Sequence, residues 1–311
     1  MGDVLAGIHA TWEFDTDSVL IRFERGIRTP KLFQSLRERR IPYAALSSVT
    51  LTPGKRGTVV LRAVPRAGAD PLVEAASGQL KEGCDPYRLV LPAEREVLAE
   101  YYADELRALL DPASGESADR FLVAAPEAPM NFKAYDGRAS FDGERISFRW
   151  SWTGASSAKW KAGDQTFRVS ELAGIVWRSP EALDGYLRLV PRAAAPVDHR
   201  TGGSGDADGG APAGVPAAPP AAGADKDPAA VLFGLGYGPV HESLPFAAAV
   251  LESVRRTQPA PAGSAPALVN AGRRDPADIA ERIHHLGELH RAGLVTDAEY
   301  SAKKAQLLAE L

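Results

Sequence analysis

The chain has one cysteine, no long apolar run and no excess of basic charge. Because Cys84 is alone, no internal disulfide can form, which fits a reducing compartment. No apolar run approaches the roughly 20 residues that a helix needs to cross a bilayer, and residues 1–14 lack the basic and long apolar segments of a secretion signal. The net charge of −4 over 311 residues argues against a dedicated nucleic-acid binder. We therefore expect a cytoplasmic globular protein.

Motifs that carry chemistry are also missing. The sequence has no glycine-rich phosphate loop, no G-x-S-x-G elbow and no Cys/His cluster. Cys84 lies in the turn KEGCDP without a nearby histidine to activate it, so a loop cysteine is favoured over a nucleophile. We predict no catalytic residue, no metal, no cofactor and no small-molecule substrate, and hence no enzyme.

What the sequence does contain is an internal repeat of one unit. Residues 41–66 (IPYAALSSVTLTPGKRGTVVLRAVPR) align without a gap with residues 167–192 (FRVSELAGIVWRSPEALDGYLRLVPR), which begin 126 positions later. Flanking matches extend the unit: residues 14–23 with 141–150, after one residue of slippage, and residues 85–91 with 227–233. The chain is therefore predicted to hold two copies of one fold.

The repeated unit is predicted to be mostly strand, closed by a helix. SVLIRF (18–23) and RISFRW (145–150) alternate with period two, as half-buried strands do. In residues 94–110, apolar residues recur at three- and four-residue steps, which indicates a helix; residues 241–256 are its expected counterpart. This order resembles the pleckstrin-homology-like superfold, so the fold class is α+β, with two tandem partial barrels each capped by a C-terminal helix.

The repeat also fixes the predicted domain boundaries. The Pro/Gly-rich stretch 193–227 corresponds to a connection between two strands of the first copy, so we interpret it as a disordered insertion rather than a domain linker. The predicted order is repeat 1 at 1–112, a linker at 113–130, repeat 2 at 131–257, a linker at 258–274 and a helical hairpin at 275–311.

The hairpin follows from capping and periodicity. Asp275 and Pro276 suit a helix start, Gly293 suits its end, and Thr296 with Glu299 has capping-box spacing for a second helix. So short a hairpin cannot bury enough core by itself, so its apolar stripe needs a partner. The predicted interface is Ile279, Ile283, Leu286, Leu289, Leu294, Tyr300, Leu307 and Leu308.

The segment from Ile279 to Leu308 resembles the SHOCT domain, with the core G-L-V-T-x-x-E-Y-x₂-K-K. That resemblance implies an oligomerisation or partner-docking device without catalytic residues. The whole chain resembles an actinobacterial family of unknown function, in which two pleckstrin-homology-like copies precede a SHOCT tail. The long insertion after Arg192 departs from the minimal pattern.

Three histidines inside IHHLGELH suggest a metal site at first sight. No pair among His284, His285 and His290 has the i, i+4 spacing that chelates one ion, and at about 100° per residue they point in different directions. We therefore favour a docking helix over a metal site, with an intersubunit site or a pH-dependent interface as the alternative.

Two further segments attract attention. Residues 22–40 of the first copy are strongly basic, and Arg25, Arg28, Lys31, Arg37, Arg39 and Arg40 are the candidates for binding an anionic membrane surface. We favour a solvated loop whose side-chain stems pack on the sheet over a membrane-binding segment. The tryptophans of WSWTGASSAKWK (150–161) suggest base stacking, but the repeat favours sheet core or rim at these positions.

We therefore expect a non-catalytic scaffold or adaptor. Its tandem repeats would bind a protein partner, and its hairpin would self-associate or dock on another protein. The alternative is a peripheral protein that binds anionic lipid through the basic segment of repeat 1. No nucleic-acid partner is expected.

Overall fold

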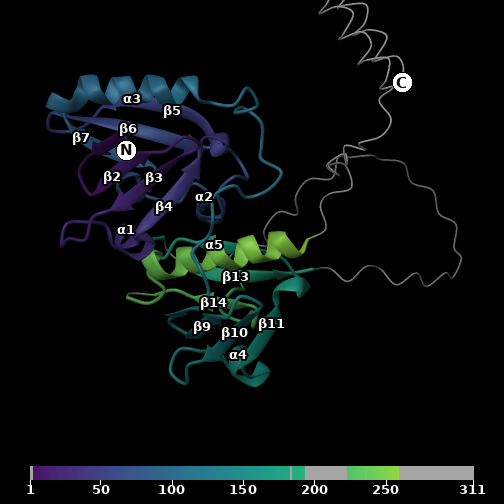
Figure 1. The fold of residues 1–311 in the computed structure, drawn as a ribbon. Coiled ribbons are helices and arrows are strands. Elements are labelled where there is room, and N and C mark those ends of the chain that lie inside the picture. The colour runs from purple at the N-terminus through teal and green to yellow at the C-terminus, as the bar shows by residue number, and fades with distance from the viewer. Residues whose placement is uncertain (1–2, 183, 193–222, 235, 259–311) are drawn as a thin grey trace, which may run out of the picture. The chain divides into compact units, whose positions relative to one another are not determined.

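A computed structural model describes residues 3–182, 184–192, 223–234 and 236–258. Two successive sets of strands, each closed by a helix, make up these residues (Figure 1). The predicted hairpin, the linker before it from residue 259 onward, and most of the predicted insertion lie outside the described residues.

Repeat 1 consists of two antiparallel sheets and three helices. The first sheet runs in the order β1-β2-β3-β4 and the second in the order β5-β6-β7. Helix α1 lies between β3 and β4, α2 between β6 and β7, and α3 follows β7. The bounds are β1 Asp3–Ala6, β2 Ala10–Phe14, β3 Ser18–Phe23, α1 Lys31–Leu36, β4 Glu38–Pro42, β5 Leu46–Pro53, β6 Thr58–Pro65, α2 Pro71–Ala76, β7 Arg88–Pro92 and α3 Glu96–Ala108.

Repeat 2 has the same plan. Its sheets run β8-β9-β10-β11 and β12-β13-β14, with α4 between β10 and β11 and α5 after β14. The bounds are β8 Met130–Lys133, β9 Gly137–Phe141, β10 Arg145–Trp150, α4 Ser157–Ala162, β11 Gln165–Arg168, β12 Leu172–Arg178, β13 Tyr186–Pro191, β14 Ala230–Leu232 and α5 Val240–Thr257. The mixed α+β composition and the duplication are therefore confirmed.

A duplicated ion pair shows that the two copies match in detail. Arg62 Nε lies 2.9 Å from Asp85 Oδ2 in repeat 1, and Arg188 Nε lies 3.0 Å from Asp227 Oδ2 in repeat 2. Each aspartate lies near the end of the connection between the second and third strands of the three-stranded sheet. In sequence order, residues 193–222 therefore fall between β13 and β14, as α2 falls between β6 and β7 in repeat 1.

The predicted strands and helices lie where periodicity placed them. Ile146 and Phe148 of β10 are fully buried and their neighbours are not, which confirms the period-two interpretation there. In β3, Val19 and Ile21 are fully buried, but Leu20 between them is buried as well, so this strand is covered on both faces. Helix α3 turns Ala99, Ala103 and Leu106 into the core of repeat 1. Several short elements were missed. The strand β1 precedes those predicted, so the basic segment lies between the third and fourth strands, and the helices α1, α2 and α4 occupy segments that were predicted without helix.

Residues 109–129 connect the repeats and lie against repeat 1. The backbone N–H groups of Leu122 and Val123 donate to the carbonyl of Ala69 at 2.8 and 3.0 Å, and Val123 is buried. This part of the predicted 113–130 linker is therefore anchored at several points along its length.

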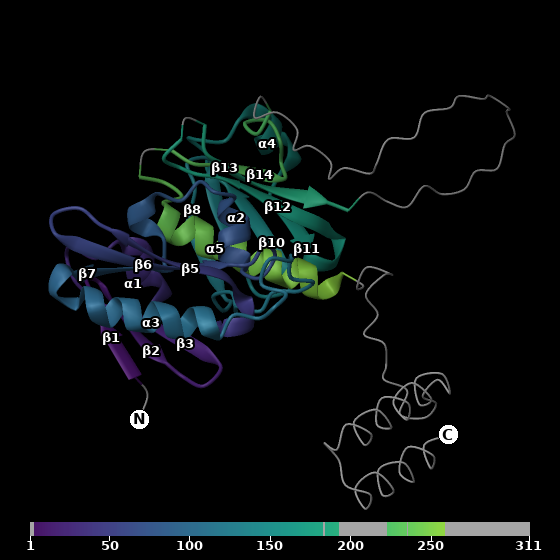
Figure 2. The same ribbon diagram turned by 90° about the horizontal axis from the view of Figure 1, so that it is seen from above.

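Helix α5 is shared by the two repeats. It packs on β8 and β12 of its own repeat and on α1 and α2 of repeat 1, and Figures 1 and 2 show it between the two sets of strands. Its sequence explains this position, because the run LPFAAAV (244–250) is apolar on every side and all seven residues are buried. Residues up to Gln258 accordingly form one compact unit.

Candidate functional site: the loop ends of the two repeats

Two connections lie at one end of each repeat, which we call its loop end. One joins the last two strands of the four-stranded sheet, and the other joins the last two strands of the three-stranded sheet. In repeat 1 these connections carry α1 and α2, and both helices contact α5. Leu32 of α1 and Leu72 of α2 are buried in the same core as Phe246 and Val250 of α5. The loop end of repeat 1 is therefore a surface that holds a helix.

Polar contacts fix this interface at both ends. Arg255 Nη1 of α5 lies 3.2 Å from Glu74 Oε2 and donates to the Gly68 carbonyl at 3.2 Å. Gln79 donates to the Trp177 carbonyl at 3.1 Å and accepts from the Ser179 N–H at 2.9 Å. These directional contacts select one arrangement of repeat 1 on repeat 2.

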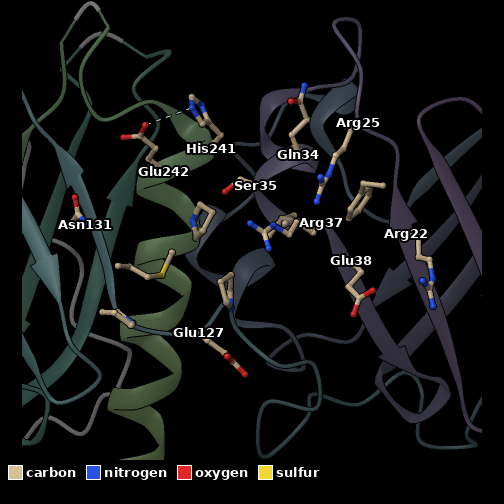
Figure 3. A pocket seen from close by; sticks show the side chains of 16 residues that line it. Arg22, Arg25, Gln34, Ser35, Arg37, Glu38, Glu127, Asn131, His241 and Glu242 are labelled. Atoms are coloured by element: carbon tan, nitrogen blue, oxygen red, sulfur yellow. Dashed lines mark ion pairs between the residues drawn. The ribbon is translucent and has the colours of Figure 1, made fainter.

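A cleft of about 920 Å³ remains beside the shared helix. In Figure 3, Arg25, Gln34 and Arg37 extend from repeat 1 on one side, while His241 and Glu242 lie on α5 across from them. Burial lowers the pKa of His241, and the neighbouring Glu242 opposes that shift. The charged lining groups also include Arg22, Glu38 and Glu127, so arginines and glutamates balance. The cleft is therefore not a strongly cationic pocket.

The structure divides the predicted basic residues into two groups. Arg40 Nη1 lies 2.5 Å from Asp15 Oδ2 at the surface, while Arg39, the next residue in β4, is 5% exposed and cannot contact a membrane. The other four side chains are exposed and form no ion pair with another described residue: Arg25, Arg28, Lys31 and Arg37. The candidate anionic-surface site is thus smaller than the sequence suggested.

Arg39 belongs to a buried polar cluster. Its Nη2 donates to Asp70 Oδ1 at 2.8 Å and its Nε to the Tyr87 hydroxyl at 3.0 Å, and that hydroxyl donates to Asp70 Oδ2. Asp70 also caps α2 by accepting from the Leu72 N–H at 2.8 Å. Burial alone would lower the pKa of Arg39, but Asp70 and Tyr87 more than offset this and raise it above its ordinary value. The cluster holds β4 and α2 together under the interface with α5.

The loop end of repeat 2 is built on a different buried pair. Ser156 caps α4 by accepting from the Lys159 N–H, and Lys159 Nζ lies 2.5 Å from Asp136 Oδ2 with both side chains buried. The ammonium also lies 5.0 Å from the centre of the Trp150 ring. Burial lowers the pKa of Lys159, and Asp136 opposes the shift. This pair fixes α4 on the sheet.

Two tryptophans stand exposed beside α4. Trp152 is 81% exposed and Trp160 51% exposed, and their rings meet edge to face at 5.5 Å. The expectation that these positions form sheet core or rim is wrong for Trp152, because β10 ends at Trp150 and the alternation ends with it. We call Trp152, Ala158, Trp160 and Ala162 the α4 surface; all four are exposed.

The α4 surface is the counterpart of the repeat 1 surface that faces α5. Helix α1 begins at Lys31 and α4 at Ser157, at the same offset as the sequence repeat, so Leu32 and Leu36 correspond to Ala158 and Ala162. By the same alignment, the cleft residues Gln34 and Arg37 correspond to Trp160 and Gly163; Arg25 corresponds to Trp152 in the register of the preceding strands, which is shifted by one residue. Sequence reasoning missed this surface, although its small and aromatic residues stand at positions where repeat 1 contacts a helix.

Other candidates contribute little to a site. Within the described residues no group of three or more His, Cys, Asp or Glu side chains is placed to hold a metal ion, and no helix there combines the length and apolarity needed to traverse a bilayer. Cys84 is half-buried, and burial raises the pKa of its thiol. The predicted interface residues Ile279, Ile283, Leu286, Leu289, Leu294, Tyr300, Leu307 and Leu308 lie outside the described residues, as do His284, His285 and His290.

The fold and these surfaces define a tandem-repeat α+β protein whose two copies share one helix. The sequence profile of one family, described as domain of unknown function (DUF4429), matches residues 12–107 and again residues 139–251. The chain belongs to this family, and the two matched segments coincide with repeats 1 and 2. No curated protein matches the chain.

Proposed function

We propose that each repeat is a pleckstrin-homology-like domain. Its support is the order of elements: a four-stranded antiparallel sheet, a three-stranded antiparallel sheet and a closing helix, twice in one chain. Such scaffolds serve many functions, so the function has to be argued from the surfaces.

On this scaffold the protein acts as a non-catalytic adaptor. Its tandem repeats bind a protein partner, and its C-terminal SHOCT-like hairpin self-associates or docks on another protein. One observation carries the proposal: the loop end of repeat 1 already holds a helix, and the equivalent α4 surface of repeat 2 is exposed and carries Trp152 and Trp160. Tryptophan is enriched where protein interfaces concentrate their binding energy.

The buried and half-buried ionisable groups support a non-catalytic role. Arg39, Asp70 and Tyr87 satisfy one another in the core, and Lys159 with Asp136 does the same under α4. The raised pKa of Cys84 keeps its thiol protonated near neutral pH, where the thiolate would be the nucleophile. These groups are used to hold elements together.

A pull-down with matched variants tests the adaptor role. Full-length wild type and Ile27→Asp, a change at an exposed position away from the α4 surface, should retain the same bound protein. Trp152→Ser/Trp160→Ser should lose it. Retention of the partner by the tryptophan variant would show that the α4 surface is not the binding surface.

The hairpin needs its own test. Ile283→Asp/Leu286→Asp places charge on the predicted apolar stripe, and light scattering should then report a lower mass than for wild type. An unchanged mass would remove self-association through the hairpin from the proposal.

A second candidate function is binding to an anionic membrane surface. It is favoured by the loop between β3 and α1, where Ile27 is fully exposed between Arg25 and Arg28, and where Lys31 begins α1. An exposed apolar side chain among basic residues suits shallow insertion beside acidic headgroups.

Co-sedimentation with phosphatidylserine vesicles, against phosphatidylcholine vesicles, tests this candidate. Arg25→Glu/Arg28→Glu should abolish pelleting, whereas Arg40→Glu, at a residue already paired with Asp15, should have a much smaller effect. Failure of the wild type to pellet with acidic vesicles would eliminate the candidate.

A further inference from the structure

Exposed large apolar side chains concentrate at two places in the described part of the chain. Of eleven such residues, four lie on α3 or its C-terminal cap and three at the loop end of repeat 2. The first group is Val97, Leu98, Tyr101 and Leu109, and the second is Tyr135, Trp152 and Trp160. Contiguous exposed apolar surface of this kind marks interaction sites.

The outer face of α3 is apolar and flanked by acids. Val97 and Tyr101 lie one turn apart, on the side of the helix opposite the buried Ala99 and Ala103, and are 80% and 54% exposed. Glu100 and Asp104 stand beside them and are exposed. The helix thus has apolar residues on its solvent-facing side as well as on the side that packs on the core.

Helix α3 is the counterpart of α5, because each closes its repeat. In α5 the outer face is covered by α1 and α2 of repeat 1. The chain therefore contains one complete pair of matching surfaces, formed by the loop end of repeat 1 and α5. It also contains the two halves of a second pair, the α4 surface and α3, each exposed.

We propose that the α4 surface of one copy binds the outer face of α3 in a second copy. The contact repeats between chains the arrangement that the loop end of repeat 1 makes with α5 within a chain. Trp152 and Trp160 stand where repeat 1 has Arg25 and Gln34, which line its cleft beside α5, so the larger rings fill the equivalent space and contact Val97 and Tyr101. The exposed alanines Ala158 and Ala162 let the helix approach closely.

Charge favours the same pairing. Lys161 follows Trp160, and Lys133 lies over the ring of Tyr237, which contacts Tyr135; both lysines are exposed. They face a helix whose apolar stripe is bordered by Glu100 and Asp104; because Asp104 already pairs with Arg107 at 2.6 Å, the charge attraction rests on Glu100. Opposite charges at the rim of an apolar contact orient the two surfaces and discourage other partners.

The proposed contact is heterologous, since one copy contributes α3 and the other contributes α4. Two variants that each lack a different half should therefore complement each other, which an isologous contact would not allow. The inference rests on the proposed use of the α4 surface as a protein-binding surface, and it specifies the occupant.

Light scattering of the full chain tests the proposal, in an Ile283→Asp/Leu286→Asp background that removes hairpin association. The average mass of the Ile283→Asp/Leu286→Asp protein should rise above the monomer mass of 33.1 kDa as its concentration increases. Val97→Asp/Tyr101→Asp alone and Trp152→Ser/Trp160→Ser alone should each remain at the monomer mass, and their equimolar mixture should reach about twice that mass. Lys55→Asp, at an exposed position between β5 and β6, should associate as the background does.

Ala158→Arg gives a second test of the same surface, because it leaves both tryptophans in place and blocks approach of a helix. Matching thermal transitions would show that each variant is folded. A background protein that stays monomeric at all concentrations, or a mixture that stays monomeric, overturns the proposal. Loss of a pulled-down partner in the tryptophan variant, without any change in mass, would leave the adaptor role standing and reject the second copy as occupant.

Discussion

Two adjacent arginines of β4 give the sharpest stability prediction. Arg39 and its partner Asp70 are 3% and 0% exposed at their side chains, while Arg40 and Asp15 are 52% and 43% exposed. Arg39→Met removes one partner of a buried pair and leaves an unpaired carboxylate, which costs about 3–5 kcal/mol. Arg40→Met breaks an exposed pair, which is worth about 0–1 kcal/mol.

Thermal unfolding followed by circular dichroism measures both effects. At about 2–4 °C per kcal/mol for a domain of this size, the midpoint should fall by about 6–20 °C for Arg39→Met and by at most about 4 °C for Arg40→Met. Arg39→Met/Asp70→Asn should recover part of the loss, because the amide can still cap α2 without a buried charge. Equal small shifts for the two single variants would refute the assignment of Arg39 to the core.

Three further predictions follow from local structure. Lys159→Ala should lower the thermal midpoint as strongly as other broken buried pairs, whereas Lys161→Ala, at an exposed position two residues on, should change stability by no more than about 0.5 kcal/mol. Arg37 has φ +60°, and the equivalent residue of repeat 2 is Gly163 with φ +69°, so Arg37→Gly should raise the unfolding free energy by up to about 1 kcal/mol in denaturant titrations. Cys84 should react slowly with a thiol reagent at pH 7, faster as pH rises toward its raised pKa, and rapidly after unfolding; fast reaction of the folded protein at pH 7 would contradict its environment.

Local patterns in the sequence predicted most of the fold. Period-two alternation located β10 because one face of that strand lies on a core, whereas β3 is buried at five of its six positions. Three- and four-residue spacing located α3, although Val97, Leu98, Tyr101 and Leu109 of that pattern are exposed and much of the face on the core is formed by Ala99 and Ala103. Sequence similarity between the copies then located the connection between β13 and β14. By its composition alone, this stretch resembles a domain linker.

The candidate site was harder to predict, because it depends on contacts between the repeats. Arg39 looked like part of a basic loop, yet it shares a strand face with the buried Ile41, two residues away. Its partner Asp70 lies in another connection, and no local pattern links them. Trp152 was misplaced because the alternation of β10 was extended past its last residue.

Helix α5 shows a signal that was present but not used. Its run LPFAAAV has no polar side, which is typical of a helix buried all round; the helix was predicted, but not its contact with repeat 1. That contact is what defines the loop end of repeat 1 as a helix-binding surface, and hence the α4 surface as its exposed counterpart.

Site-specific photocrosslinking in cells tests the central claim most directly. A photoreactive phenylalanine analogue is placed at Trp160 in one full-length protein and at Ile27 in another. Binding of a protein through the α4 surface predicts discrete protein adducts from position 160 and none of the same mass from position 27. Protein adducts that form only at position 27, or no protein adduct at position 160, would contradict it.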